Sequence, residues 1–283
     1  YRADLLYPKE RGFGAALSVM GYRIAMWVSS GLALIIADHG NWQVAYCVMA
    51  ALLFIGVITT LFSPEPTWQA KPPVSLKEAV IEPFKEFITR SHAITILIFI
   101  ILYKLGDAFA GSLTMTFLLR GLEFSLTEVG LIYKLLVIFA TIIGGLLSGA
   151  LMIRYGLYRC LLWFGILQAV TNFGFMVLAW VGKSYLGMII VIALENFAGG
   201  MGTIAFVALL MALCNHHYTA TQFALLSSLA AIGRVFVGPP SGYLVDALGW
   251  VIFFFITFLV ALPGLFLLLG LKNRIENYDQ NNA

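Results

Sequence analysis

Apolar residues run along this chain in long stretches, each about the 20 residues that a helix needs to cross a membrane. Short polar turns such as Asp38-His39-Gly40-Asn41 and Val181-Gly182-Lys183 separate most of them. The pattern predicts eight transmembrane helices. They cover residues 12–38, 42–63, 93–119, 126–152, 157–181, 184–214, 219–247 and 250–271.

The longest interruption, residues 64–92, begins with Pro64-Glu65-Pro66 and carries Pro72-Pro73. Its second part, Ser75 to Arg90, predicts an amphipathic helix because apolar residues recur there at helical spacing. These residues are Leu76, Val80, Phe84 and Phe87. We interpret 64–92 as a linker between two helical bundles.

Composition agrees with this pattern. Hydrophobic residues make up 61% of the chain and charged residues 11%, against about 45–50% and 25% in soluble domains. The sequence therefore predicts an all-α integral membrane protein. Its basic residues form no stripe, so no nucleic acid is expected as a partner. Cys47, Cys160 and Cys214 lack the spacing of a metal or redox site, and we interpret them as small buried apolar residues.

Basic residues set the orientation, because they gather on the cytoplasmic side of membrane proteins. Arg120 and Lys183 lie on one side of the predicted spans. The other side receives Arg2, Lys9, Arg11, Lys71, Lys77, Lys85, Arg90, Arg154, Arg159, Lys272 and Arg274. The linker and the tail, residues 272–283, are therefore predicted to be cytoplasmic.

Two of the predicted spans resemble each other. Arg23 is followed after seven residues by Ser30-Gly31, and Arg234 after seven residues by Ser241-Gly242. A repeat of the first span in the seventh implies a unit of six helices. Residues 1–63 would then end a first bundle and residues 93–271 form a second. Paired six-helix units are the architecture of the major facilitator superfamily. We expect this fold, with about eight of twelve transmembrane helices present and four preceding Tyr1.

Strongly charged residues lie inside the predicted spans. Each costs about 2.5–3.5 kcal/mol at a helix centre, so they are expected to face one another, the protein interior or a water-filled cavity. Cations exceed anions among them, which favours an anionic substrate. A set of purely structural ion pairs is the alternative. The six residues are Arg23, Lys104, Asp107, Lys134, Glu195 and Arg234.

These side chains differ in their predicted roles. Lys104 and Asp107 are three residues apart and form an intrahelical pair. Glu195 has no basic neighbour at helical spacing. We therefore predict Glu195 as the proton-coupling carboxylate, with Asp107 as the second candidate. The predicted substrate-binding residues are Arg23, Lys104, Lys134, Asn196, Gln222 and Arg234. For the uncharged Asn196 and Gln222, contact with substrate and helix joining are equally open.

The turn from Gly149 to Arg159 resembles the loop that helps to close the inner gate in facilitator-superfamily transporters. Gly149, Arg154, Gly156 and Arg159 carry the resemblance. Ile153 stands where the family usually has an acidic residue.

Longer strings resemble the AmpG-type muropeptide permeases of Gram-negative bacteria. Examples are Leu102-Tyr103-Lys104-Leu105-Gly106-Asp107 and Ala220-Thr221-Gln222-Phe223. Further matching segments are 11–23, 195–202 and 205–211.

The resemblance implies import of N-acetylglucosaminyl-1,6-anhydro-N-acetylmuramyl peptides from periplasm to cytoplasm, driven by the proton gradient. That traffic would serve peptidoglycan recycling and β-lactamase induction. It also implies a multi-pass protein of the bacterial inner membrane, with the lipid bilayer as its surroundings and an anionic sugar-peptide as its substrate. We expect no cofactor, no metal and no obligate protein partner. Because family members begin earlier, we expect this chain alone not to transport without the preceding helices.

Two other functions remain open at this stage. One is a facilitator that carries another organic anion. The other is a membrane-embedded transferase, which is disfavoured because no catalytic constellation is evident and His216 and His217 are interpreted as solvated turn residues. The sequence is therefore not expected to be an enzyme.

Overall fold

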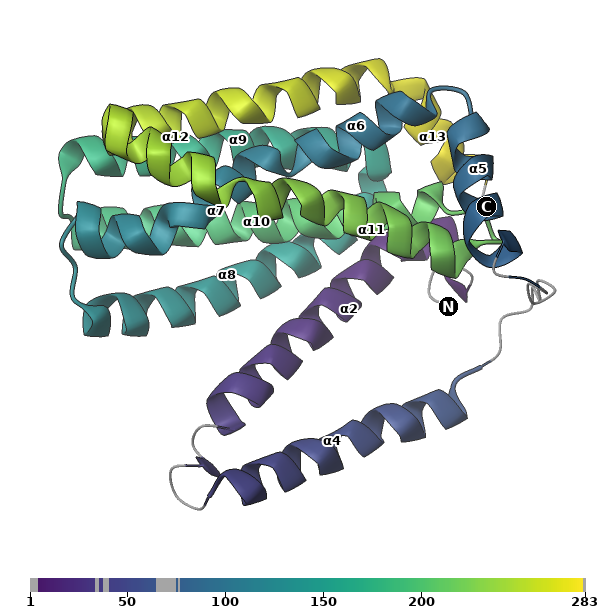
Figure 1. Cartoon of the computed structure of the whole chain (residues 1–283), viewed down its shortest axis with the longest axis horizontal. Helices are drawn as coiled ribbons and strands as arrows, with labels where there is room; N and C mark the ends of the chain where they lie inside the picture. Colours follow the sequence, from purple (N-terminus) through teal and green to yellow (C-terminus); the bar gives the residue numbers. More distant parts are fainter. Residues whose placement is uncertain (1–4, 34–35, 38–40, 65–74, 76, 282–283) are drawn as a thin grey trace.

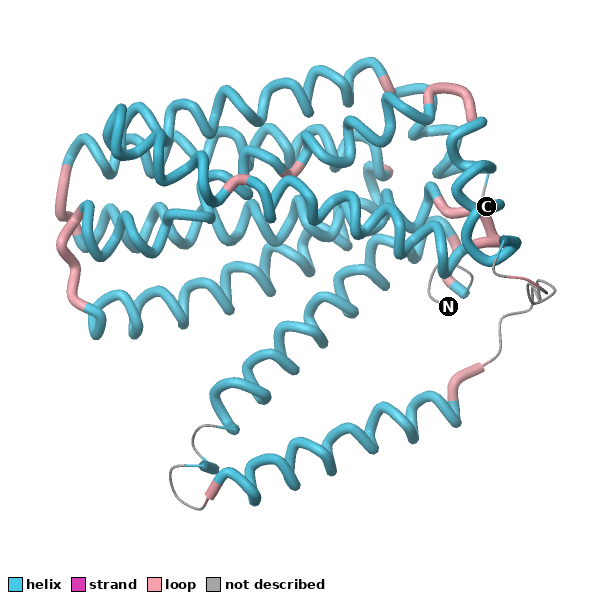
Figure 2. The backbone as a smooth tube through the Cα atoms, viewed as in Figure 1, coloured by secondary structure: helices cyan, strands magenta, loops and turns pink. Residues whose placement is uncertain are grey.

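The computed structural model describes residues 5–33, 36–37, 41–64, 75 and 77–281, and these contain helices but no strand (Figure 2). The helices, some ending in a π-helical turn (η), have the following bounds. They are α2 Pro8–Trp27, η1 Val28–Leu32, α4 Trp42–Phe62, η2 Lys77–Ile81, α5 Glu82–Thr89, α6 Ala93–Tyr103, α7 Leu105–Thr116, η3 Phe117–Gly121, α8 Leu126–Tyr155, α9 Leu157–Val181, α10 Tyr185–Leu213, α11 Thr219–Phe236, α12 Gly238–Gly270 and α13 Lys272–Asn281.

Six helical stretches of the described residues are long and apolar enough to cross a membrane. The last, Thr219–Gly270, contains two predicted spans, because Gly249 has φ 78° and ψ 170° and ends the helical path. Glycine takes this positive φ without a steric cost. α2 is helical as predicted but carries Lys9, Glu10, Arg11 and Arg23, which lower its apolar character. The described parts of all eight predicted spans are thus largely helical, with interior breaks at Lys104 and Val237.

The helices from α6 to α12 form one bundle, and α2 packs on it through α8 and α10 (Figure 1). Glycines allow a close approach of α8 and α10. A Cβ atom at Gly200 would lie 2.5 Å from the carbonyl oxygen of Thr141, and one at Gly144 would collide with the carbonyl of Phe197. These two helices therefore meet backbone to backbone, which positions α10 deep in the bundle.

α4 differs from the other spans because it lies away from the bundle (Figure 1). Of its side chains, Ala45 is buried, while residues 50–62 are exposed. The predicted burial of the cysteines is confirmed for Cys160 and Cys214 but is wrong for Cys47. Cys47 is on α4, where no described helix covers it.

The described parts of the linker and of the tail both contain helices. The predicted amphipathic helix is confirmed over Lys77–Thr89, with Phe87 buried at 4% exposure. The tail, predicted only as a cytoplasmic extension, forms α13, whose Ile275 packs into the main core. A hydrogen bond of 3.1 Å from Arg274 to Ser91 ties it to the start of α6.

Candidate functional site

The centre of the site lies at a helix break within the third predicted span, residues 93–119. Lys104 has φ −100° and ψ 0°, so α6 ends at Tyr103 and α7 begins at Leu105. Tyr103 anchors the end of α6, because its buried hydroxyl donates to the carbonyl of Leu161 at 2.8 Å. Asp107 consequently lies in the first turn of α7, where the helix dipole stabilises a negative charge.

Two donors hold Asp107. The ammonium group of Lys104 lies 3.1 Å from Oδ2 of Asp107, which confirms the predicted intrahelical pair. The side-chain amide of Gln168, on α9, donates to the same oxygen. Gly202 on α10 makes room for that amide, because a Cβ atom there would collide with the Gln168 side chain. α7, α9 and α10 therefore meet at this carboxylate.

Glu195 completes the arrangement from α10. Its Oε2 lies 2.7 Å from the hydroxyl of Thr171 on α9, and it is within electrostatic range of Asp107 and Lys104. Two carboxylates thus share one nearby ammonium group. We call the five residues the central cluster: Lys104, Asp107, Gln168, Thr171 and Glu195.

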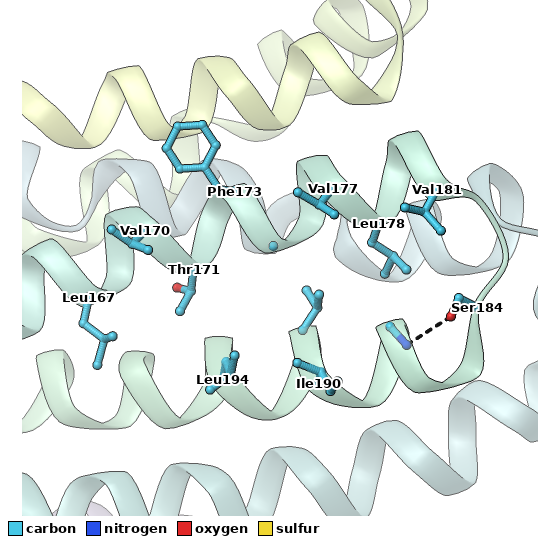
Figure 3. Close-up of a pocket in the computed structure, with 13 residues that line it drawn as sticks. Leu167, Val170, Thr171, Phe173, Val177, Leu178, Val181, Ser184, Ile190 and Leu194 are labelled. Atoms are coloured by element: carbon cyan, nitrogen blue, oxygen red, sulfur yellow. Dashed lines mark hydrogen bonds between the residues drawn. The ribbon is translucent and has the colours of Figure 1, made fainter.

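A cavity of about 450 Å³ borders the central cluster between α9 and α10 (Figure 3). Thr171 extends from α9 into the space facing α10, beside the apolar side chains of Leu167, Val170 and Leu194. The cavity is therefore apolar where it meets the hydroxyl group.

The other predicted substrate residues do not join this cluster in the described part of the chain. Asn196 donates its amide to the carbonyl of Ile192 in its own helix, at 2.8 Å. The buried Nε of Arg23 has no hydrogen-bond partner among the described residues, and Arg234 is exposed on α11. The side chain of Lys134 lies outside the described residues. Substrate contact stays a prediction for these four.

Gln222 joins helices, the other of the two roles left open for it. Its side chain is 1% exposed. The amide nitrogen donates to the carbonyl of Pro83 at 3.1 Å and to Glu86 at 2.6 Å, and the oxygen accepts from the backbone of Asn215 at 2.7 Å. Gln222 lies beside the end of α10 at Leu213, and Leu213 is about 27 Å from Glu195 along the axis of α10 at 1.5 Å per residue. The contact of Gln222 with substrate stays a prediction.

Arg90 extends this second arrangement. Its guanidinium donates to both oxygens of Glu86, at 3.0 and 2.8 Å, and to the last carbonyl of α10, that of Leu213, at 2.6 Å. Burial alone raises the pKa of Glu86, but the hydrogen bonds from Arg90, Gln222 and Asn215 and the charge of Arg90 outweigh it and lower the pKa. We call Glu86, Arg90, Asn215 and Gln222 the linker cluster.

The predicted gating turn has the expected local shape. Gly156 has φ 78° and separates α8 from α9, with Arg154 and Arg159 exposed on either side. Gly149 is buried where α8 meets α2, and a Cβ atom there would lie 3.0 Å from the side chain of Ala16. The tight turn is confirmed, and its role in gating stays a prediction.

Sequence reasoning missed Thr171 and the break at Lys104. The available signal was a pair of amides, Gln168 and Asn172, four residues apart in an otherwise apolar helix. Both are buried, at 5% and 1% exposure. Neither amide atom of Asn172 has a hydrogen-bond partner among the described residues. The polar face of α9 therefore indicated a buried site, but not which carboxylates it meets.

A bundle of membrane-spanning helices with charged residues gathered at an interior helix break defines a multi-pass membrane transporter. The chain matches the Major Facilitator Superfamily model over residues 1–238 and 105–282, and it belongs to this superfamily.

Several relatives refine this assignment. The chain is 51% identical to the "Anhydromuropeptide permease" of Escherichia coli (strain K12), over 98% of this chain and 56% of that protein. It is 36% identical to "Putative transporter AmpG 4" of Rickettsia conorii, over 97% of this chain and 68% of that protein. The two relatives are named as a permease and a transporter. With the superfamily match and the membrane-spanning helices, they support a multi-pass protein of a bacterial inner membrane. The chain spans little more than half the length of the Escherichia coli relative.

Proposed function

We propose that this chain is part of a proton-coupled importer that carries anhydro-muropeptides from periplasm to cytoplasm. The observation that carries the proposal is the 51% identity to the Escherichia coli anhydromuropeptide permease along nearly the whole chain. The segments that suggested the family therefore lie within one match that covers 98% of this chain. The import would supply peptidoglycan recycling and, through the same products, β-lactamase induction.

The central cluster supports proton coupling at Glu195. Asp107 accepts from both Lys104 and Gln168, and such donors stabilise an ionised carboxylate. Glu195 has the neutral hydroxyl of Thr171 as its hydrogen-bond partner. With both acids ionised the cluster carries one excess negative charge, and one proton makes it neutral. We assign that proton to Glu195.

The cationic residues support an anionic substrate. Lys104 is partly exposed, at 19% of its side chain, and Arg23 and Arg234 lie on α2 and α11. Guanidinium and ammonium groups are the protein donors that best match peptide carboxylates. We propose these cations, with Lys134 and Asn196, as the substrate contacts. We further propose that α5 and α13 face the cytoplasm, as the distribution of basic residues favours.

The test is uptake of radiolabelled anhydro-muropeptide into right-side-out vesicles. The gene product that contains this chain is expressed in a strain lacking its own permease, with the 283-residue chain, the Glu195→Gln variant and an empty vector in parallel. Each is measured with and without a protonophore. We expect protonophore-sensitive uptake by the gene product and background uptake by Glu195→Gln.

The outcomes separate the parts of the proposal. Uptake that is unchanged by the protonophore and is retained in the Glu195→Gln variant would refute proton coupling. It would not contradict the proposed substrate. Uptake of other organic anions but not of the muropeptide would refute the substrate. Recovery of a chemically altered sugar-peptide would favour a transferase. Loss of β-lactamase induction in a strain without the gene, restored by the wild-type gene only, would support the downstream role.

A further inference from the structure

The hydroxyl of Thr171 lies between two acceptors. Its oxygen is 2.8 Å from the carbonyl oxygen of Gln168, three residues earlier in α9, and 2.7 Å from Oε2 of Glu195 on α10. A hydroxyl group carries one hydrogen and accepts through its lone pairs. It can therefore donate one full hydrogen bond at a time. A backbone carbonyl has no hydrogen to donate, so both contacts are hydrogen bonds only when Glu195 supplies the second hydrogen.

The Thr171 hydroxyl has no third hydrogen-bond partner among the described residues. Thr171 is 8% exposed and borders an apolar part of the cavity between α9 and α10, next to Val170 and Leu194 (Figure 3). Its hydrogen-bond partners within the described part of the chain are the Gln168 carbonyl and Glu195. Buried polar atoms that lose a partner carry a free-energy cost, so the protonation state of Glu195 matters to α9.

Two arrangements of hydrogens follow. When Glu195 is protonated, its carboxyl O–H donates to Thr171, and the Thr171 hydroxyl donates to the Gln168 carbonyl, so both contacts are made. When Glu195 is ionised, Thr171 turns its hydrogen to the carboxylate and releases the Gln168 carbonyl. One proton enters or leaves at Glu195, and no covalent bond changes elsewhere.

We propose that Thr171 is a positioning residue that links the protonation state of Glu195 to the backbone of α9 at Gln168. Gln168 in turn holds Asp107 through its side-chain amide, so the proton on Glu195 is also coupled to the Lys104–Asp107 pair through α9. This inference rests on the proposed role of Glu195 as the proton-coupling carboxylate.

The charged groups that act on Glu195 are Lys104 and Asp107, from the junction of α6 and α7. The helices packed against α10 carry other charged residues, at positions away from Glu195. The side chain of Lys134, on α8, is outside the described residues. The described ones are Lys9, Glu10, Arg11, Arg23, Glu128, Arg154, Arg159, Arg234, Lys272, Arg274 and Glu276.

The test is infrared difference spectroscopy of the gene product in proteoliposomes, between acidic and alkaline pH. The C=O band of the protonated Glu195 carboxyl is identified by its loss in Glu195→Gln. Thr171→Val removes the hydroxyl at nearly constant volume, Thr171→Ala removes it with less bulk, and Thr171→Ser keeps it. Thr257→Val is the matched control, because Thr257 is buried and donates to the carbonyl of Phe254 three residues earlier in α12.

We expect the Glu195 band to move to higher wavenumber in Thr171→Val and Thr171→Ala, because the carboxyl loses its acceptor. Thr171→Ser and Thr257→Val are expected to match wild type. Where uptake is measurable, its pH profile should change in Thr171→Val and be restored by Thr171→Ser. A Glu195 band that does not move in folded Thr171→Val or Thr171→Ala protein, or no Glu195 band at any pH, would overturn the inference. The spectroscopic result needs no transport, so it is independent of the substrate proposal.

Discussion

The central cluster and the linker cluster contain nearly the same residue types but are proposed to have different roles. Each has a carboxylate with a basic residue on the same helical stretch, Asp107 with Lys104 and Glu86 with Arg90, and a glutamine from another helix. In the linker cluster one cation meets one carboxylate, and Arg90 also caps α10 through the Leu213 carbonyl. The central cluster adds a second carboxylate, Glu195, without a second cation among the side chains that the structure describes.

That difference explains why only one of the two clusters is proposed to move protons. In the linker cluster one carboxylate is balanced by one guanidinium, and the hydrogen bonds and charge around Glu86 lower its pKa, which keeps it ionised near neutral pH. A group of two carboxylates around one ammonium changes from one net negative charge to neutrality by taking up one proton. The same residue types therefore hold helices together in the linker cluster and form the proposed proton-binding site in the central cluster. The difference lies in the balance of positive and negative charges. Four variants test this comparison.

Lys104→Met should have the largest effect on stability. It leaves Asp107 without its cation in a partly buried position, and breaking such a pair costs about 3 kcal/mol. Thermal unfolding in detergent measures the loss. The double variant Lys104→Met with Asp107→Leu removes both charges and should recover most of it. If the single variant unfolds at the wild-type temperature, the central cluster is not held by this pair.

Arg90→Ala should come next, lowering the free energy of unfolding by about 2 kcal/mol, as expected for losing hydrogen bonds to a charged group. It removes the guanidinium donor from Glu86, which keeps its hydrogen bonds from Gln222 and Asn215, and from the Leu213 carbonyl. Arg90→Lys is the control, because it keeps the charge but not the forked geometry and should lie in between. Proton-driven uptake per folded molecule should be unchanged, and a loss of proton sensitivity would contradict the contrast between the clusters.

Asn172→Leu should raise stability by about 1 kcal/mol, because a buried amide with no described partner costs free energy. The matched variant Gln168→Leu, one turn earlier on the same face of α9, should instead lower stability, because Asp107 loses a donor. Melting temperatures of the two variants decide the point. Destabilisation by Asn172→Leu would indicate that the amide serves a bound water or substrate.

Glu86→Gln should have the smallest effect and should depend on pH. The pKa of Glu86 is lowered in the folded protein from its ordinary value of 4.5. Its charge therefore contributes stability above that ordinary value, and the contribution is lost as the pH falls through the lowered pKa. Wild type and Glu86→Gln should differ in melting temperature near neutral pH and converge in acid. A gap that widens in acid would refute the assignment.

The sequence predicted the secondary structure well and the site only in part. Long apolar runs leave little choice but transmembrane helices, and Gly238-Pro239-Pro240 divides α11 from α12 as its composition indicates. The Lys104–Asp107 pair was predictable because it depends on local spacing. Thr171, by contrast, is 24 residues from Glu195. Two partners of Gln222, Pro83 and Glu86, lie in α5, 139 and 136 residues away. Such contacts arise from packing, which a single sequence does not record.

The position of Cys47 offers a practical handle on the molecule. Of the three thiols, Cys160 and Cys214 are buried, whereas Cys47 is exposed on α4, the helix that lies away from the bundle (Figure 1). A membrane-permeant maleimide dye should therefore label the wild-type chain at one place without any engineered cysteine. Its emission would report on the environment of α4 alone, so rearrangements of that helix could be followed separately from those of the bundle.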